Sequence, residues 1–227
     1  MEYSIGDRIA IVRENIERAA QGRPVVLVGV AKTKPAELVR QAVAAGLTVI
    51  GENYVQEIRD KSAAGAYEGA NVHLIGHLQK NKVKYVAGRV DMIQSVDSPE
   101  LMEEISRRAL GANAVQDILL EVNIGGEGSK TGIPPERLPE LFQAAGELPG
   151  IRVRGLMAIP PAENSRAYFP RMYQLYIDNK AKKYDNVIMD FLSMGMSDDY
   201  TDAIKEGANM VRVGSFIFGP RDYATNT

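Results

Sequence analysis

Lys32 is the residue of this chain whose surroundings best suit nucleophilic chemistry. It follows an apolar run, residues 25–31, that predicts a buried strand, and Pro35 then opens a predicted helix. A buried strand would partly desolvate the lysine amine, and Lys34 would add a second cation nearby. Both effects favour the neutral, nucleophilic form of an amine, which can form a Schiff base with a carbonyl. The competing interpretation is an ordinary surface lysine in front of a helix.

Two turns that contain glycine and serine indicate an anion site. Gly195 and Ser197 lie in "SMGMSDDY", where a predicted strand turns into a helix, and Gly214 and Ser215 follow the last predicted strand. Small residues let backbone N–H groups approach an anion, and hydroxyl groups add donors. In eight-stranded α/β barrels the loops after strands seven and eight commonly form a phosphate site. Together the two turns favour phosphate binding over ordinary turn chemistry.

Arg212 is an unusual residue for a predicted strand. It lies between Val211 and Val213, so its side chain points to the opposite side from theirs, toward the expected interior. An arginine stays protonated, and a buried one needs an acceptor. The spacing leaves open whether that acceptor is a ligand or a neighbouring carboxylate.

The elements that would position these residues alternate between strand and helix. The predicted strands are apolar with little alternation, which is typical of parallel strands covered on both sides; they are residues 25–31, 47–52, 71–76, 91–96, 116–124, 151–159, 189–195 and 209–215. About eight strand–helix units in a chain of this length predict an α/β fold with a single (β/α)8 TIM-type barrel. A doubly wound open sheet is the alternative. Ser4 and Asp7 predict a capping box at the start of an extra N-terminal helix.

Composition excludes several classes of protein. The chain has 27 basic and 29 acidic residues among 227, so no global field points to nucleic acid. No stretch approaches the ~20 apolar residues of a membrane span, and the charged N-terminus is no signal peptide. Cysteine is absent, which excludes disulfides, thiolate metal sites and a cysteine nucleophile. We therefore expect one cytoplasmic domain over residues 1–227, with neither a nucleic-acid nor a membrane partner.

Two motifs resemble a phosphate-binding loop and a zinc site, but each lacks a feature that such a site requires. "GGEGSKTG" resembles a P-loop, but Ser129 stands where that pattern requires a glycine. His73 and His77 have the spacing of a helical zinc pair, but on an extended strand four residues span ~13 Å, too far for two ligands of one metal. We expect no metal.

Seven motifs follow one another along nearly the whole chain: "VAKTKP", "GENYVQE", "HLIGHLQKNK", "VNIGGEGSKTG", "GLMAIPP", "LSMGMSDDY" and "VRVGSFIFG". As an ordered set they resemble the pyridoxal 5'-phosphate (PLP) homeostasis protein family, known as YggS-like, whose fold is similar to the barrel domain of bacterial alanine racemase. The resemblance implies a Schiff base between PLP and Lys32, and Arg212 as the partner of the pyridine nitrogen. It also implies a phosphate grip, that is, a group of residues that bind the phosphate: Ser197, Gly214 and Ser215. Further residues that would line the pocket are Asn53, Met194, His77 and Asn123.

The same resemblance implies a role in intracellular PLP homeostasis, as a carrier and regulator that influences amino-acid and keto-acid balance. PLP-dependent apo-enzymes are candidate recipients, and we expect a monomer without robust catalysis and without catalytic residues. Two alternatives stay open: a PLP-dependent amino-acid racemase of low activity, and a Schiff-base aldolase that acts on a phosphorylated substrate. In alanine racemase a tyrosine from a second domain of the partner subunit serves the other face of the substrate, and we expect this chain to have no room for such a domain. For Tyr223, in the short tail, we expect a packing role.

Overall fold

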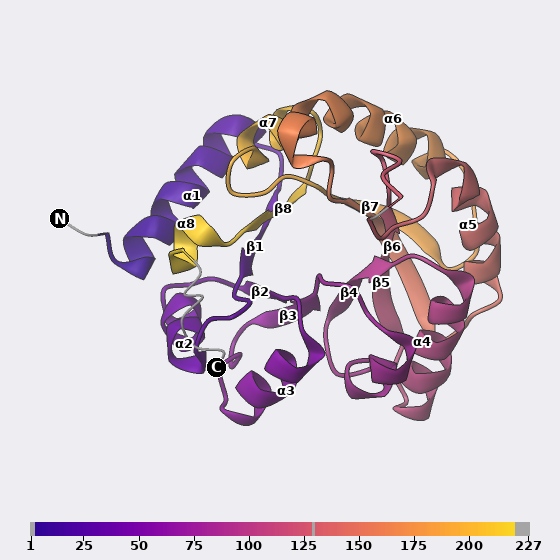
Figure 1. The fold of residues 1–227 in the computed structure, drawn as a ribbon, viewed down its shortest axis with the longest axis horizontal. Helices are drawn as coiled ribbons and strands as arrows, with labels where there is room; N and C mark the ends of the chain where they lie inside the picture. The colour runs from indigo at the N-terminus through magenta and orange to yellow at the C-terminus, as the bar shows by residue number, and fades with distance from the viewer. Residues whose placement is uncertain (1–2, 129, 221–227) are drawn as a thin grey trace.

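The strands form a closed barrel, as the sequence predicts. The computed structural model describes residues 3–128 and 130–220, and within them eight parallel strands pair in chain order. Because β1 pairs with β8 as well as with β2, the sheet closes and is not an open doubly wound sheet (Figure 1). The strands are β1 Val26–Val30, β2 Val49–Glu52, β3 Asn71–Leu74, β4 Met92–Val96, β5 Gln116–Val122, β6 Ile151–Ala158, β7 Val187–Ser193 and β8 Met210–Val213.

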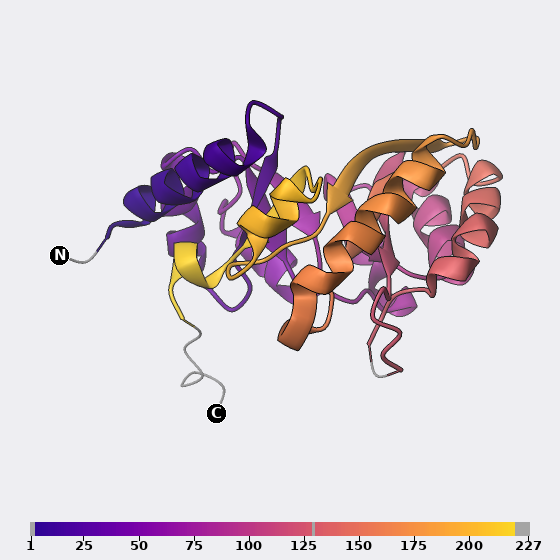
Figure 2. The same cartoon turned by 90° about the horizontal axis from the view of Figure 1, so that it is seen from above.

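Helices surround the barrel on its outer side (Figures 1 and 2). The α-helices are α1 Ile5–Ala20, α2 Ala36–Ala44, α3 Val55–Ala63, α4 Pro99–Gly111, α5 Leu138–Gly146, α6 Phe169–Lys180, α7 Tyr200–Lys205 and α8 Ser215–Phe218. The described residues also contain the 3-10 segments η1 Lys80–Tyr85, between β3 and β4, and η2 Pro135–Arg137 and η3 Ala162–Tyr168, which precede α5 and α6.

The extra N-terminal helix α1 begins with the predicted capping box. The Ser4 hydroxyl accepts the Asp7 N–H at 3.1 Å, and the Asp7 carboxylate accepts the Ser4 N–H at 3.0 Å. Ile9, Val12 and Ile16 form the buried side of the helix. α1 packs against α7 and α8, which follow β7 and β8, so it supports the side of the barrel where the two serine turns lie.

The barrel interior contains an apolar cluster together with buried polar side chains, among them His73, Gln94 and Arg212. Six side chains form one buried cluster on the barrel axis: Val28, Val49, Met92, Leu119, Met157 and Met210. Since alternate residues of a strand face the same side, Val30 follows Val28 and Arg212 follows Met210 on the inner surface. The alternation therefore carries Arg212 to the mouth of the barrel.

A register shift between β6 and β7 depends on Gly155. Its φ is 146°, and a Cβ at this position would lie 1.9 Å from the Phe191 carbonyl oxygen, which only glycine avoids. Beyond the shift Met157 pairs with Ser193. The bulge thus sets which residues of β6 and β7 reach the carboxyl ends of the strands.

Several elements differ from the sequence prediction in their bounds, and two of these differences concern where helices form. The stretch from Gln79 to Gly88, predicted to be helical, forms a 3-10 segment only over Lys80–Tyr85, although Val83, Val86 and Ala87 are buried. Short 3-10 segments of this kind commonly serve as connectors. The last strand ends at Val213 and not at Ser215. The chain turns there because the Gly214 carbonyl accepts the N–H groups of Ile217 and Phe218, which starts α8.

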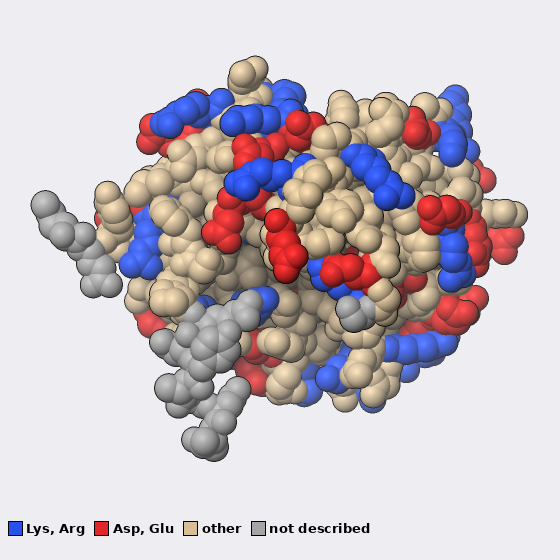
Figure 3. Space-filling model, turned by 45° about the horizontal axis from the view of Figure 1, so that its top comes forward, with Lys and Arg blue, Asp and Glu red and all other residues tan. Residues whose placement is uncertain are grey.

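Acidic and basic side chains are interspersed over the face seen in Figure 3, in keeping with a net charge of −2. Among the described residues, no helix combines the length and the hydrophobicity that crossing a membrane requires.

Candidate functional site

A cavity of about 280 Å³ opens at the carboxyl ends of β1, β2, β7 and β8. Its lining combines apolar walls with three basic side chains and one acidic one: Val30, Lys32, Lys34, Asn53, Ile75, Ile159, Met196, Ser197, Asp198, Arg212, Gly214, Ser215, Phe218 and Gly219. The excess of basic groups favours an anionic ligand. Six of the nine residues that the sequence analysis assigns to the cofactor site lie in this lining.

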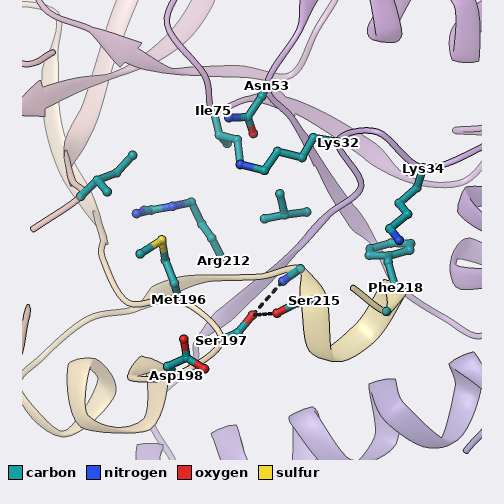
Figure 4. Close-up of a pocket in the computed structure, with 14 residues that line it drawn as sticks. Lys32, Lys34, Asn53, Ile75, Met196, Ser197, Asp198, Arg212, Ser215 and Phe218 are labelled. Carbon is teal, nitrogen blue, oxygen red and sulfur yellow. Dashed lines mark hydrogen bonds between the residues drawn. The ribbon is translucent and has the colours of Figure 1, made fainter. Parts of the chain in front are cut away.

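Lys32 lies in the loop between β1 and α2, two residues beyond the end of the strand. Its side chain is half-buried and extends into the cavity, with Asn53 and Ile75 nearby (Figure 4). Lys34 lines the same cavity, and its Nζ donates to the Pro220 carbonyl oxygen at 2.5 Å. Both cations of the predicted pair therefore reach the cavity.

Ser197 and Ser215 lie across the cavity from Lys32 (Figure 4), and Gly214 belongs to the same lining. The Gly214 N–H donates to Ser197 Oγ at 3.2 Å, and the Ser215 hydroxyl donates to the same oxygen at 3.2 Å. Both serines come from turns that follow the last two strands of the barrel. The structure thus gathers two hydroxyl groups and one backbone N–H in one place.

Asp199 holds the turn that carries Ser197, and sequence reasoning missed it. One carboxylate oxygen accepts the Met196 N–H at 2.6 Å, and the other accepts the Ser165 hydroxyl. Gly195, with a φ of 93°, makes the turn possible because a Cβ there would lie 2.6 Å from that of Ala203. An aspartate directly before a helix is a capping signal, and this was the signal available in the sequence.

Arg212 is 3% exposed and is bonded to neutral acceptors. Its Nη1 donates to Ser193 Oγ at 2.6 Å and its Nη2 to the Ala158 carbonyl oxygen at 2.9 Å. Burial lowers the pKa of Arg212 to about 10, against the attraction of Glu121 and Asp199. The guanidinium therefore stays protonated at neutral pH, and its described hydrogen bonds go to a hydroxyl and a carbonyl oxygen, not to a carboxylate.

Asn53 follows β2 directly and brings an unsatisfied acceptor to the cavity. Its Oδ1 is buried and has no hydrogen-bond partner among the described residues. Buried polar atoms are almost always hydrogen-bonded, so an orphaned acceptor in a cavity wall indicates a donor on a ligand or an ordered water.

Met194, His77 and Asn123 lie elsewhere. Met194 is fully buried in the hydrophobic core, and its neighbour Met196 lines the cavity instead, because the chain turns at Gly195. His77 is exposed, and the Asn123 amide donates to the Glu127 carbonyl oxygen at 2.8 Å, within the glycine-rich loop. Tyr223 lies outside the described residues.

His73 belongs to the barrel interior. Its Nδ1 lies 2.9 Å from Gln94 Nε2, and since an amide nitrogen can only donate, the ring accepts at Nδ1. Gln94 in turn accepts from the Ser193 hydroxyl at 2.8 Å. No pattern in the sequence predicts this series of hydrogen bonds, which reaches Arg212 through Ser193.

Comparison with known proteins places the chain in a family. The family model described as the N-terminal domain of alanine racemase matches residues 8–222. The pyridoxal phosphate homeostasis protein of Aquifex aeolicus is 46% identical over 226 residues, which cover 96% of this chain and 98% of that protein. The protein of the same name from Pseudomonas aeruginosa is 43% identical over 229 residues, which cover 97% of this chain and 97% of that protein.

Solved structures agree with these relatives. PipY of Synechococcus elongatus PCC7942, solved with PLP bound, is 32% identical and superposes with a TM-score of 0.82 over 95% of this chain and 100% of that one. The same protein without PLP gives a TM-score of 0.86. On sequence, length and fold together, the chain belongs to the pyridoxal phosphate homeostasis protein family, whose barrel is that of the alanine racemase N-terminal domain.

Proposed function

We propose that this chain binds PLP in the cavity at the barrel mouth and acts in PLP homeostasis, as a carrier and regulator of the cofactor. The observation that carries the proposal is one cavity with a lysine amine on one side and a group of hydroxyl and N–H donors on the other, in a member of this family. In the same proposal the chain acts as a monomer and supplies PLP-dependent apo-enzymes.

The residues present fit the cofactor. The Ser197 and Ser215 oxygens are 3.2 Å apart, longer than a typical bond between hydroxyl groups, so a phosphate could replace that contact with shorter, charge-assisted bonds. Asn53 Oδ1, buried without a described partner, needs a donor of the kind that a substituted pyridine offers. Val30, Ile75 and Ile159 supply apolar walls for a flat ring.

When bound, PLP supplies an aldehyde that condenses with a primary amine and a ring that can take up electrons. Lys32 is the amine we assign to hold the aldehyde. Arg212 is the group we assign to the ring nitrogen. Because a guanidinium carries only donors, a nitrogen that faces it must remain an unprotonated acceptor, and an unprotonated ring takes up electrons weakly. This pairing suits retention of the cofactor better than rapid turnover.

The described cavity lining also argues for a carrier. Racemisation needs a proton donor and an acceptor on opposite faces of the substrate, and a positioned acid or base contributes ~10²–10⁴-fold to the rate. The described lining residues include lysines and Asp198 but neither a tyrosine nor a histidine. We therefore propose that amino-acid turnover is slow or absent.

The decisive experiment locates the covalent bond. Borohydride reduction of the PLP-loaded protein, followed by peptide mapping, should leave the pyridoxyl group on Lys32. Lys32→Ala should abolish the visible absorbance band without lowering the urea midpoint, since it removes a half-buried charge and not core volume. Lys82→Ala, at an exposed lysine of η1, is the control and should retain the band. A pyridoxyl group on Lys34 would contradict the assignment.

A further inference from the structure

The backbone on both sides of Lys32 is bound by side chains of α3. Lys61 Nζ donates to the carbonyl oxygen of Ala31, the residue before Lys32, at 2.8 Å. Glu57 Oε2 accepts the N–H of Thr33, the residue after Lys32, at 2.8 Å. Lys61 and Glu57 also bind each other at 2.8 Å, one helical turn apart. One ion pair therefore grips both neighbours of Lys32, although neither of its members lines the described cavity.

The turn that this pair holds is unfavourable by itself. Thr33 has a φ of 62°, in the left-handed region that β-branched residues rarely adopt. Such a conformation persists only where its surroundings impose it. The Thr33 side chain is exposed, so core packing does not impose this conformation. The turn is held by the charge-assisted bond from the Thr33 N–H to Glu57 and by the Lys34 N–H, which donates to the Ala31 carbonyl oxygen at 3.1 Å.

Lys61 is buried, and its charge is removed from water at a desolvation cost. Its side chain is 7% exposed and that of Glu52 is 0% exposed, and their 2.8 Å ion pair must offset the desolvation of both charges. Lys61 uses all three of its donors, on Ala31, Glu52 and Glu57. Glu52 Oε1 also accepts the Tyr67 hydroxyl at 3.0 Å. These bonds hold the cluster in one arrangement. One of the three hydrogen bonds that Lys61 donates goes to the backbone next to Lys32.

We infer that Lys61 and Glu57 are positioning residues for Lys32: by clamping Ala31 and Thr33 they fix the turn and so direct the Lys32 amine into the cavity. This inference rests on the proposed function of Lys32 and adds to it a second layer of residues that do not touch the ligand.

The principal test is Glu57→Ala, which leaves Lys61 paired with Glu52 and so retains the buried ion pair. In the ligand-free protein, amide hydrogen exchange at Thr33 should become faster because its N–H loses its acceptor. The apparent affinity for PLP, measured as the yield of borohydride-trapped Lys32 over a series of PLP concentrations, should fall roughly 10-fold. A decrease of this size corresponds to the loss of one charge-assisted hydrogen bond. Pyridoxine 5'-phosphate, which lacks the aldehyde, should bind as tightly as before.

Further variants separate positioning from general damage to α3. Gln56→Ala is the matched control: it removes an exposed contact to Asp60 on the same helix and should leave exchange and trapping unchanged. Glu57→Gln retains an oxygen that can accept the Thr33 N–H and should lose less than Glu57→Ala. Thr33→Asn, a residue that tolerates the left-handed region, should restore much of the trapping in the Glu57→Ala background.

Lys61 is tested in a double variant, Glu52→Gln with Lys61→Met, which avoids leaving the Glu52 carboxylate charged and unpaired. Trapping on Lys32 should again fall while pyridoxine 5'-phosphate binding persists, with the urea midpoint recorded to confirm folding. Trapping equal to wild type in both Glu57→Ala and this double variant would overturn the inference and leave the proposed function intact. So would a loss that Gln56→Ala reproduces or that Thr33→Asn fails to restore. Absence of any label on Lys32 in the wild-type protein would instead refute the proposed function.

Discussion

At the scale of single residues, burial decides what each charged group can do. Arg212 is buried, yet its described acceptors are the neutral Ser193 hydroxyl and Ala158 carbonyl. Its charge is therefore not cancelled by a contacting carboxylate, and it adds to the positive potential of the cavity. Ser197 and Ser215 stand at the cavity with hydroxyl groups that bind each other only at 3.2 Å. Both hydroxyl groups can therefore donate to a stronger acceptor, such as an anion, in the cavity.

The first prediction at this scale concerns the phosphate grip. In Ser197→Ala with Ser215→Ala, PLP retention should weaken by the loss of two charge-assisted bonds, each contributing roughly 1.5–3 kcal/mol. Pyridoxal, which has no phosphate, should be affected far less. Equilibrium dialysis of both ligands measures the difference, with Ser62→Ala, at an exposed serine of α3, as the control. If both ligands weakened equally, the phosphate would bind elsewhere.

At the scale of elements, strand register places the groups around Arg212. The shift between β6 and β7 brings Ala158 and Ser193 to the carboxyl ends of their strands, where both accept from the guanidinium. Gly155 makes the shift possible because its backbone passes so close to the Phe191 carbonyl that no side chain fits. A glycine remote from the cavity therefore controls the acceptors of a cavity residue.

Gly155→Ala should consequently destabilise the protein by more than about 2 kcal/mol, because the contact is with backbone and cannot be relieved by a rotamer change. The urea midpoint measures this effect. Gly111→Ala is the matched control: a Cβ at that helical position meets nothing within 4 Å, so its midpoint should be unchanged or slightly higher. A neutral Gly155→Ala would show that the bulge can form without glycine.

At the scale of the whole molecule, a line of hydrogen bonds crosses the barrel. Arg212 donates to Ser193, Ser193 to Gln94, and Gln94 to His73, so β8, β7, β4 and β3 are joined through the interior. Burial lowers the pKa of His73 to about 4, against the attraction of the Asp91 and Asp117 carboxylates. The folded protein therefore resists protonation of His73, whereas the unfolded chain does not.

The sign of the resulting pH dependence follows from linkage. Between pH 6.5 and 4 the unfolded chain binds a proton at this position that the folded protein excludes, so the contribution of His73 to stability is complete above pH 6.5 and is lost as the pH falls. We compare the free energy of unfolding of the wild-type protein with that of His73→Gln. The wild-type value less the variant value should be lower by about 2 kcal/mol at pH 5 than at pH 8. Urea titrations of both proteins at the two pH values measure it. Taking the difference removes the opposite trend of Glu52, whose pKa burial raises to about 7. A difference that did not change with pH would mean that His73 is protonated within the fold.

The sequence by itself determined the architecture and most of the cavity. Apolar strands alternating with helices specify parallel strands covered on both sides, and the closed barrel confirms that prediction. Because all carboxyl ends of such strands meet at one face, residues far apart in sequence, such as Lys32, Asn53 and Ser197, had to lie near one another, and they line one cavity. Local rules sufficed here, since strand periodicity and capping depend on neighbours in the chain.

Only the tertiary structure decided which atoms meet. Met196 and not Met194 reaches the cavity because the chain reverses at Gly195, a turn whose geometry depends on Ala203 and Asp199. The acceptors of Arg212 depend on a register shift two strands away, and the clamp on Lys32 depends on how α3 docks beside β2. The contacts of Arg212 and of the clamp join residues 19 to 54 positions apart, and their distances are set by the packing of whole elements. Sequence periodicity indicates only the buried side of each element, so it does not predict these contacts.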